Sequence, residues 1–277
     1  MTSTARQQVI LELLERQGAC SYRELRDLLR VSMMTVRRDV DALESRRAVI
    51  KTLGGVQKAD APAYLYETPL MSRLPVHNAE KRAIALQCMG LLAPGQTVFL
   101  DGSTTCLETA KLVAREHDGV TIITNSAFVC LELGRNPRNT VIAIGGQFDQ
   151  DTGSFVGSTS EEAAGKFFVD LALMSTKGFL PAEGTFESSL ANFRIKQIIA
   201  SHSAHLALLV DHSKFGQRAL CKVLDVASIR TIITDDAAPA AEIEGLRAAG
   251  KRVLVASVRS EIGAIAAGGD DRCPLRP

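Results

Sequence analysis

Short, almost continuously apolar runs alternate with helical stretches over residues 97–256, and this alternation constrains the fold more than any other feature. Four or five apolar residues in succession are typical of a strand that is buried on both faces of a parallel sheet. The helical stretches between the runs supply the long crossovers that parallel strands require. The pattern predicts an α/β body with a mainly parallel sheet. Its strands are expected at residues 97–100, 120–124, 140–144, 170–174, 206–210, 230–234 and 252–256.

Small polar residues follow the predicted strands, at the carboxyl edge of the sheet, where open α/β sheets bind ligands. The run Asp101-Gly102-Ser103-Thr104-Thr105 lies between a strand and a helix. Its glycine permits a tight turn, and its hydroxyl and amide groups lie at a helix N-terminus, which attracts anions. The run lacks the Gly-Lys-Ser/Thr ending of a Walker loop and the Gly-x-Gly-x-x-Gly of a dinucleotide site. It therefore predicts a site for a lone phosphate group rather than for a nucleotide.

Polar side chains after the other strands extend this candidate effector site. Lysines there are candidate partners for phosphate, and carboxyl and amide groups are candidate partners for sugar hydroxyls. Each loop taken singly also fits a purely structural turn. The expected effector-binding residues are Asp101, Gly102, Ser103, Thr104, Thr105, Asn125, Gly146, Lys177, Asp211 and Lys214. His205 and His212 have no carboxylate or metal-ligand spacing around them, so neither a metal nor a cofactor is expected.

Residues 1–58 have a different pattern, which predicts three short helices and a β hairpin. The second and third helices are separated by about three residues, as in a helix-turn-helix, and the hairpin adds a wing. The signals are a helix over 5–17 that ends at Gly18, a capping box of Ser21 and Glu24, an N-cap at Ser32, a buried stripe of Val36, Val40 and Leu43, and a strand over 49–53 closed by Gly54-Gly55.

The third helix carries groups suited to duplex DNA. A recognition helix presents its first turn to base edges in the major groove and its flanks to phosphates. Either Arg37 or Arg38 is suited to guanine or to phosphate, and the sequence leaves these roles open. Arg47 and Lys51 flank the wing and are expected to contact phosphates, which position a protein without specifying sequence. The expected DNA-binding residues are Ser32, Met33, Met34, Thr35, Arg37, Arg38, Arg47 and Lys51.

The distribution of charge also separates residues 1–58 from the α/β body. Residues 1–58 contain 11 Lys or Arg and 7 Asp or Glu, an excess of four positive charges, whereas the whole chain has a net charge of +1. A basic segment on a slightly acidic body favours a polyanion-binding head, although so modest an excess also fits a solvated surface.

The remaining features set the expected boundaries and compartment. No apolar run approaches the roughly 20 residues of a membrane span. The N-terminus lacks the apolar core of a secretory signal, so a cytoplasmic protein is expected. The six scattered cysteines, with no Cys-x-x-Cys pair, are expected to be reduced thiols. The expected divisions are a winged helix-turn-helix domain over 1–57, a linker arm over 58–79 with Pro62, Pro69 and Pro75, an effector-sensing α/β domain over 80–258 and a mobile tail over 259–277.

The N-terminal segment resembles the DNA-binding head of the DeoR family of bacterial sugar-catabolism repressors. The resemblance is carried by Val31-Ser32-Met33-Met34-Thr35-Val36-Arg37-Arg38-Asp39, by Leu43-Glu44 and by Gly54-Gly55. Leu53 departs from it, because histidine is more usual there.

The body resembles the sensor domain of the same family, whose fold is similar to ribose-5-phosphate isomerase. The matching pieces are Asp101–Thr105, Thr124-Asn125-Ser126, Gly145-Gly146, Gly157, Lys177-Gly178 and Asp211-His212-Ser213-Lys214-Phe215-Gly216. The resemblance implies a repressor that binds an operator, a phosphorylated sugar or related metabolite as effector, assembly into homodimers or homotetramers, and release of DNA on effector binding. Ser175-Thr176-Lys177-Gly178 stands where many members have a Gly-Ala-Gly-like turn.

The main alternative is a sugar-phosphate isomerase with an appended DNA-binding head. Such an enzyme needs a carboxylate that moves a proton beside a carbonyl. The similar isomerases place acidic residues after the fourth strand, where this chain has Ser175 and Thr176, and Glu183 is the nearest substitute. The sequence therefore favours a regulator over an enzyme, and no catalytic residue is expected. A purely architectural DNA-binding protein does not account for the polar sheet edge.

Overall fold

The computed structural model describes residues 2–17, 19–46, 48–52, 55–58 and 69–258. They divide into two compact units, each with its own apolar core. The first unit holds the residues up to Val76 together with 150–152, and the second begins at His77. We refer to residues 2–58 of the first unit as the head and to the second unit as the body. Gly18, Arg47, Leu53, Gly54 and the tail over 259–277 lie outside the described residues.

The head contains three helices and a three-stranded antiparallel sheet. The helices are α1 (Ser3–Gln17), α2 (Tyr22–Leu29) and α3 (Met33–Ser45). The strands are β1 (Ala19–Ser21), β2 (Val49–Thr52) and β3 (Gly55–Lys58), in the order β1-β3-β2. The three helices and the wing formed by β2 and β3 confirm the predicted winged helix-turn-helix.

The predicted capping box before α2 is present in the head. The Ser21 hydroxyl accepts from the Glu24 amide, and the Glu24 carboxylate accepts from the Ser21 amide, which completes the capping box before α2. Strand β1 is not predicted, because it is only three residues long. It accounts for Gly55: a Cβ there would lie 2.1 Å from the Cys20 carbonyl oxygen, so only glycine lets β3 lie this close to β1.

A short helix, α4 (Leu70–Arg73), lies within the segment expected to be a linker arm. It spans a single turn, too short to give a helical period in the sequence. Pro69 is its N-cap residue, with a φ of −50°. A proline at the start of a helix loses no intrahelical hydrogen bond, because the amides of the first turn have no partner in the helix.

The body is built on a seven-stranded sheet in which every pair of neighbours is parallel. The order β15-β14-β12-β9-β4-β5-β6 places β9 at the centre. The strands are β4 (Thr97–Leu100), β5 (Thr121–Thr124), β6 (Thr140–Ala143), β9 (Val169–Met174), β12 (Ser203–Leu209), β14 (Thr231–Asp235) and β15 (Arg252–Ala256). The predicted mainly parallel sheet is confirmed.

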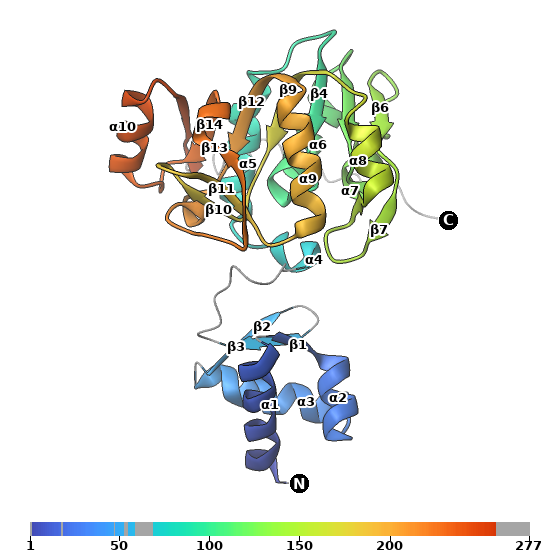
Figure 1. Cartoon of the computed structure of the whole chain (residues 1–277), viewed down its shortest axis with the longest axis vertical. Coiled ribbons are helices and arrows are strands. Elements are labelled where there is room, and N and C mark those ends of the chain that lie inside the picture. Colours follow the sequence, from blue (N-terminus) through green and yellow to red (C-terminus); the bar gives the residue numbers. More distant parts are fainter. Residues whose placement is uncertain (1, 18, 47, 53–54, 59–68, 259–277) are drawn as a thin grey trace, which may run out of the picture. The chain divides into compact units, whose positions relative to one another are not determined.

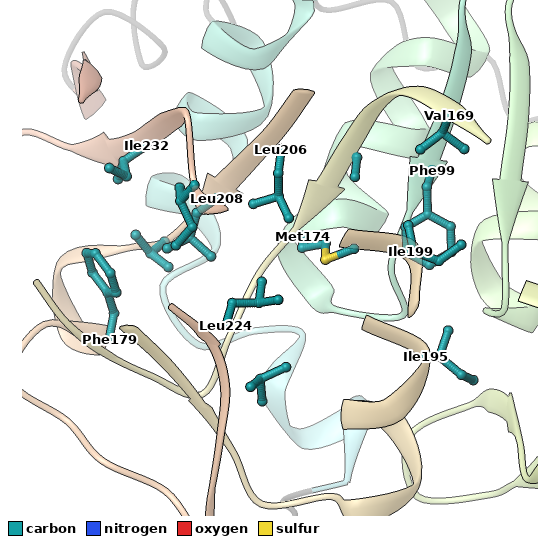
Figure 2. Close-up of a cluster of buried hydrophobic side chains, with 14 of the residues drawn as sticks. Phe99, Val169, Met174, Phe179, Ile195, Ile199, Leu206, Leu208, Leu224 and Ile232 are labelled. Carbon is teal, nitrogen blue, oxygen red and sulfur yellow. The ribbon is translucent and has the colours of Figure 1, made fainter. Parts of the chain in front are cut away.

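Helices cover both faces of this sheet (Figure 1). One layer contains α5 (Asn78–Met89), α6 (Thr104–Glu116) and α7 (Ala127–Leu133). The opposite layer contains α8 (Ser158–Ala164) and α9 (Leu190–Ser201), while α10 (Ala240–Ala248) packs beside the edge strand β15. Figure 2 shows the core between α9 and the sheet, where Ile195 and Ile199 of the helix lie near Phe99 and Met174. This packing fixes α9, and with it the polar face of α9, above the sheet.

Two smaller antiparallel elements escape sequence prediction. They are the hairpin of β7 (Gln147–Asp149) and β8 (Ser154–Val156), and a sheet of β10 (Gly178–Leu180), β11 (Gly184–Glu187) and β13 (Cys221–Asp225). Strands of three to five residues with several polar members give little periodic signal. Gly184, at φ +137°, allows β11 to lie close to its antiparallel neighbour β13, because a Cβ there would meet the Leu224 carbonyl oxygen.

Two further properties of the described residues bear on the sequence analysis. Cys20, Cys88, Cys106, Cys130 and Cys221 are all free thiols, and burial raises the pKa of Cys88 to about 12. Within the described ranges, no helix has the length and apolar character that a membrane span requires.

Candidate functional site

Helix α3 presents one polar face to solvent and buries the other. Val36, Val40 and Leu43 are buried in the head core. Met34, Arg37 and Arg38 are exposed, and the spacing i, i+3, i+4 places them on one stripe of the helix. Met34 is 73% exposed, so its side chain is available to a partner. The stripe has the size and chemistry of a surface that enters the major groove.

Other predicted DNA-binding residues have local roles. Ser32 is the N-cap of α3: its Oγ accepts from the Thr35 amide and lies 2.9 Å from the Thr35 hydroxyl. Met33 is half-buried in the same turn. The Arg37 guanidinium lies over the Tyr22 ring, 5.8 Å from its centroid, which steadies this side chain against α2. Arg47 lies outside the described residues.

Lys51 of the wing is paired with acidic groups of α3. Its Nζ lies 2.9 Å from Asp41 Oδ1 and 2.6 Å from Glu44 Oε2. Hydrogen bonds to Glu44 and Asp41 raise the pKa of Lys51, so the amine stays charged. A phosphate contact by Lys51 would therefore compete with two carboxylates of the same domain.

Asp39, the last residue of the Arg37-Arg38-Asp39 run, is buried. Its carboxylate accepts from Arg6 Nε at 2.5 Å, from Arg6 Nη2 at 3.1 Å and from the Ser3 hydroxyl at 2.5 Å. Burial by itself raises the pKa of Asp39, but the hydrogen bonds from Arg6 and Ser3 and the Arg6 charge bring it below its ordinary value. This ion pair ties α3 to α1 and so sets the orientation of the exposed stripe.

Acid should loosen this attachment. Because the folded-state pKa of Asp39 is depressed, its contribution to stability is present above the ordinary pKa of about 4 and is lost as pH falls through the folded-state pKa. Asp39→Asn is expected to speed amide hydrogen exchange in α1 and α3 at neutral pH and to flatten its pH dependence in the acid range, after correction for intrinsic rates. The matched control is Asp41→Asn, on the exposed face of α3. Equal protection of Asp39→Asn and the wild type at pH 7 would contradict this role.

The parallel strands place their carboxyl ends at one edge of the body (Figure 1), and predicted effector residues directly follow four of them in the chain. Asp101 follows β4, Asn125 follows β5, Lys177 follows β9 and Asp211 follows β12. Since β9 lies between β4 and β12, Asp101 and Asp211 follow strands that are about 10 Å apart. The predicted residues thus form two groups, one on each side of the end of β9.

Asp101 organises the first group from within. Its side chain is buried and accepts from the Ser103 amide at 2.9 Å and from the Ser175 amide at 2.9 Å. These bonds join the end of β4 to the end of β9. Ser103 in turn is the N-cap of α6, where its Oγ accepts from the Cys106 amide. The carboxylate therefore shapes the phosphate-like loop, and Gly102 and Ser103 are its partly exposed members.

Lys196 and Glu187 complete this group, although the sequence analysis did not identify them. Lys196 Nζ lies 3.1 Å from Asp101 Oδ2, donates to the Ser175 carbonyl oxygen at 2.8 Å and pairs with Glu187. Burial alone would lower the pKa of Lys196, but Asp101 and Glu187 raise it above its ordinary value. Burial would raise the pKa of Asp101, but Lys196 and the bonds from Ser103 lower it. The two buried carboxylates thus share the nearly buried Lys196 ammonium as their common partner.

Asn125 and the neighbouring glycines are also built into the edge. Asn125 Nδ2 donates to the Phe155 carbonyl oxygen at 3.1 Å and to Asn192 Oδ1 at 3.3 Å. Asn192 and Lys196 lie one turn apart on α9, so both face this edge. A Cβ on Gly102 would lie 2.2 Å from Ser154 Oγ, and a Cβ on Gly146 would lie 1.9 Å from Ser160 Oγ. Gly146 is required for this packing, because its φ is +155° and a Cβ there would also lie 2.8 Å from the Val156 carbonyl oxygen; at Gly102 the Ser154 hydroxyl can rotate away.

The second group contains the predicted lysines. Asp211 caps the 3₁₀ turn His212–Lys214 by accepting from the Ser213 amide at 3.0 Å. Its other oxygen, Oδ2, is buried and has no hydrogen-bond partner among the described residues, and the Lys214 ammonium lies 3.9 Å away. Lys177 and Lys214 are both half-buried. Thr104 and Thr105, in contrast, are buried in the first turn of α6.

The residues considered for catalysis have other partners. The Thr176 hydroxyl donates to the Phe186 carbonyl oxygen at 2.7 Å. Glu183 lies between β10 and β11 and forms an exposed ion pair with Arg218. The buried carboxylates at the edge, Asp101 and Glu187, are held by the Lys196 cation. Such pairing favours a structural role for both carboxylates.

Family models of known proteins match both units of the chain. The family model described as the DeoR C terminal sensor domain matches residues 76–236, and that of the DeoR-like helix-turn-helix domain matches residues 6–61. The chain is 28% identical over 254 residues to a putative aga operon transcriptional repressor of Escherichia coli O157:H7, covering 92% of this chain and 94% of that protein. It is 28% identical over 246 residues to the glycerol-3-phosphate regulon repressor of Escherichia coli (strain K12), covering 89% and 96%.

A solved structure adds a distant likeness. Ribose 5 phosphate isomerase A from Neisseria gonorrhoeae is 14% identical and covers 50% of this chain and 53% of its own, with a TM-score of 0.37. A likeness at this level carries no argument about function. The sensor-domain match alone spans more than half of the chain, and the helix-turn-helix match spans the head. The chain therefore belongs to the DeoR family of transcriptional regulators.

Proposed function

We propose that this protein is a sequence-specific DNA-binding regulator, and in particular a repressor of carbohydrate-catabolism genes, whose operator affinity is changed by a phosphorylated sugar or related metabolite. The observation that carries the proposal is the exposed stripe of Met34, Arg37 and Arg38 on α3. This helix is N-capped, its opposite face is buried in the head core, and the head is basic. The printed descriptions of two relatives, repressors of an aga operon and of a glycerol-3-phosphate regulon, support the class of gene and of metabolite.

The effector is proposed to bind at the carboxyl edge of the body. The N-terminus of α6, shaped by Asp101 and Ser103, offers backbone amides to an anion. Lys177 and Lys214 supply positive charge at the ends of β9 and β12. A ligand with a phosphate at one end and hydroxyls along its length can span the two groups.

Effector binding is proposed to change DNA affinity because the effector binds two arrangements of the assembly with different affinities. Two heads, brought together by a homodimer or homotetramer, bind two half-sites separated by turns of the duplex. The effector prefers one arrangement of the assembly and changes DNA affinity only to the extent of that preference. The family resemblance favours release of DNA over tighter binding, so the effector is proposed to stabilise the arrangement of the assembly that releases the operator.

A thermal-shift screen of the full-length protein tests the effector. Phosphorylated sugars and glycerol 3-phosphate are compared with their unphosphorylated counterparts. A ligand at 100 times its Kd is expected to add about 2.7 kcal/mol, which raises Tm by roughly 5–10 °C. Lys214→Ala is expected to reduce this shift while operator affinity is retained, and Lys166→Ala, an exposed lysine paired with Glu162, is the control. Equal shifts with and without phosphate would contradict the proposed ligand class.

The pairing of Lys51 predicts a small, sequence-independent effect of its removal. Lys51→Ala is expected to weaken specific and random duplexes alike and to reduce the slope of log K against log salt by no more than about 0.9, the value for one phosphate contact. Its loss should cost less affinity than that of Arg38, because Asp41 and Glu44 already hold the amine. Fluorescence anisotropy over a salt series measures both quantities. A change in sequence preference would show instead that Lys51 contacts bases.

A further inference from the structure

Two histidines and a glutamate of the body converge beside the second group of the candidate effector site, and neither the DNA contacts nor the effector contacts proposed above use their side chains. His77 directly precedes α5, Glu80 lies in its first turn, and His212 follows β12. One ligand atom from each residue lies within 4.8 Å of the other two. The rings of His77 and His212 meet edge to face, with centroids 4.9 Å apart, and His77 Nδ1 is 3.7 Å from Glu80 Oε1. The three side chains thus direct two imidazoles and a carboxylate to a common point.

Asp235 holds His212 in the orientation that metal-binding histidines adopt. Its Oδ2 lies 2.8 Å from His212 Nδ1, and its Oδ1 accepts from the His212 amide at 2.6 Å. A carboxylate only accepts, so Nδ1 carries the proton and the lone pair of the ring is on Nε2. Asp235 is fully buried, which keeps this support rigid. Such a carboxylate–histidine pair fixes the tautomer and the ring orientation of the ligating histidine.

The backbone and the solvent exposure also suit an ion. His77 adopts a left-handed conformation with φ +51° and ψ +41°, which is uncommon for a residue other than glycine. The side chains of His77, Glu80 and His212 are 32%, 23% and 29% exposed, so an ion can reach them from solvent. An open pocket lined by Glu80, Asp235, Asp236, Ala237 and Val258 adjoins the cluster. Its acidic lining favours a cation.

We propose that His77, Glu80 and His212 form a binding site for a divalent transition-metal ion, with Zn²⁺ as the preferred ion and the fourth position open to water. Two imidazoles and one carboxylate are a common ligand set for Zn²⁺ with an open position. Ligand atoms around tetrahedral Zn²⁺ lie about 3.3 Å apart, so side-chain rotations that close the present separations by up to about 1.5 Å complete the site. The ion would link the first turn of α5 to the loop after β12.

Metal titration of the full-length protein tests the site. The protein is freed of metal with a chelator and titrated with ZnCl₂ by calorimetry, and with CoCl₂ as a spectroscopic probe. His77→Asn removes an imidazole while keeping a residue that tolerates the left-handed backbone. Glu80→Gln keeps the shape of the third ligand. His117→Gln, in the loop after α6, is the matched control, and melting curves of each variant verify folding.

The proposal expects one Zn²⁺ per chain, an affinity reduced at least about tenfold in His77→Asn and in Glu80→Gln, and no change in His117→Gln. The Co²⁺ form should give visible bands of low-coordinate cobalt without a thiolate charge-transfer band. In the unaltered chain, Zn²⁺ should also protect His77 and His212 from diethyl pyrocarbonate, a readout that needs no variant. Absence of binding, retention of full affinity in both ligand variants, or a cobalt–thiolate band from the cysteines would overturn it.

Discussion

Lys196→Met is expected to destabilise the body by about 3–5 kcal/mol at neutral pH, because it leaves two buried carboxylates without their cation. Methionine preserves much of the side-chain volume, so the loss is electrostatic rather than a packing defect. The same change should disturb the phosphate-like loop, since Asp101 holds the amides of Ser103 and Ser175 as an ionised acceptor. A lower response to sugar phosphates should therefore accompany the loss of stability.

The pH dependence separates this explanation from a general loss of packing. In the wild type, the depressed pKa of Asp101 means that its stabilising contribution is present above the ordinary pKa and is lost as pH falls through the folded-state pKa. In the variant, burial without Lys196 raises the pKa of Asp101, so the carboxyl takes up a proton on folding. The difference between wild type and variant should be largest near pH 7 and should narrow towards pH 4.

Urea unfolding followed by circular dichroism at pH 7 and pH 4 measures this difference. Lys111→Met is the matched control, because Lys111 pairs with Glu108 at 2.6 Å but is 34% exposed, against 11% for Lys196. A double variant, Lys196→Met with Glu187→Gln, should recover part of the stability by removing one unpaired charge. A loss below about 0.5 kcal/mol, the usual range for surface changes, would contradict the role of Lys196.

Arg37→Ala is expected to cost about 1–3 kcal/mol of operator binding, or roughly 5- to 150-fold in Kd, if Arg37 contacts a base. The exposed guanidinium lies on the stripe with Met34 and is steadied by the Tyr22 ring, so little side-chain entropy is lost when it binds. A base contact should lower affinity for the operator more than for random DNA. A phosphate contact should lower both equally.

The measurement begins with selection of a duplex from random DNA by the full-length protein. Fluorescence anisotropy then compares the selected and a scrambled duplex for the wild type, Arg37→Ala, Arg38→Ala and Tyr22→Leu. The last variant removes the ring but leaves the guanidinium. Arg115→Ala in α6 of the body is the control for loss of charge alone. Unchanged operator affinity in both Arg37→Ala and Arg38→Ala would show that this face of α3 does not enter the groove.

The head was predictable because its signals are local. A capping box, an N-cap and a stripe of apolar residues act within four residues of one another, and each is found where the pattern places it. The exceptions are also physical. Strand β1 of the head has three residues, and helix α4, which follows the head, has four, so neither is long enough to establish a period. Which side chains steady the recognition helix was not predictable, since Arg6 and Asp39 are 33 residues apart.

The candidate effector site was predictable only in part. The polar residues that follow each strand could be identified because parallel strands share one carboxyl edge. Lys196 and Glu187 were missed, because they lie in α9 and β11 rather than after a strand of the main sheet. A polar pair at i and i+4, Asn192 and Lys196, beside the buried Ile195 and Ile199 is the sequence signal that could have found the lysine.

The sequence by itself determined the helices and strands of the head's three-helix pattern and of the main parallel sheet, and their order, because helix caps, apolar periodicity and strand–helix alternation depend on neighbours along the chain. It thereby determined a winged head followed by a parallel α/β body. Only the tertiary structure decided that Lys196 neutralises Asp101, that Arg6 clamps Asp39, and that His212 meets His77 and Glu80. These encounters depend on the spatial order of the strands and the packing of helices over them, and no short stretch of sequence encodes either.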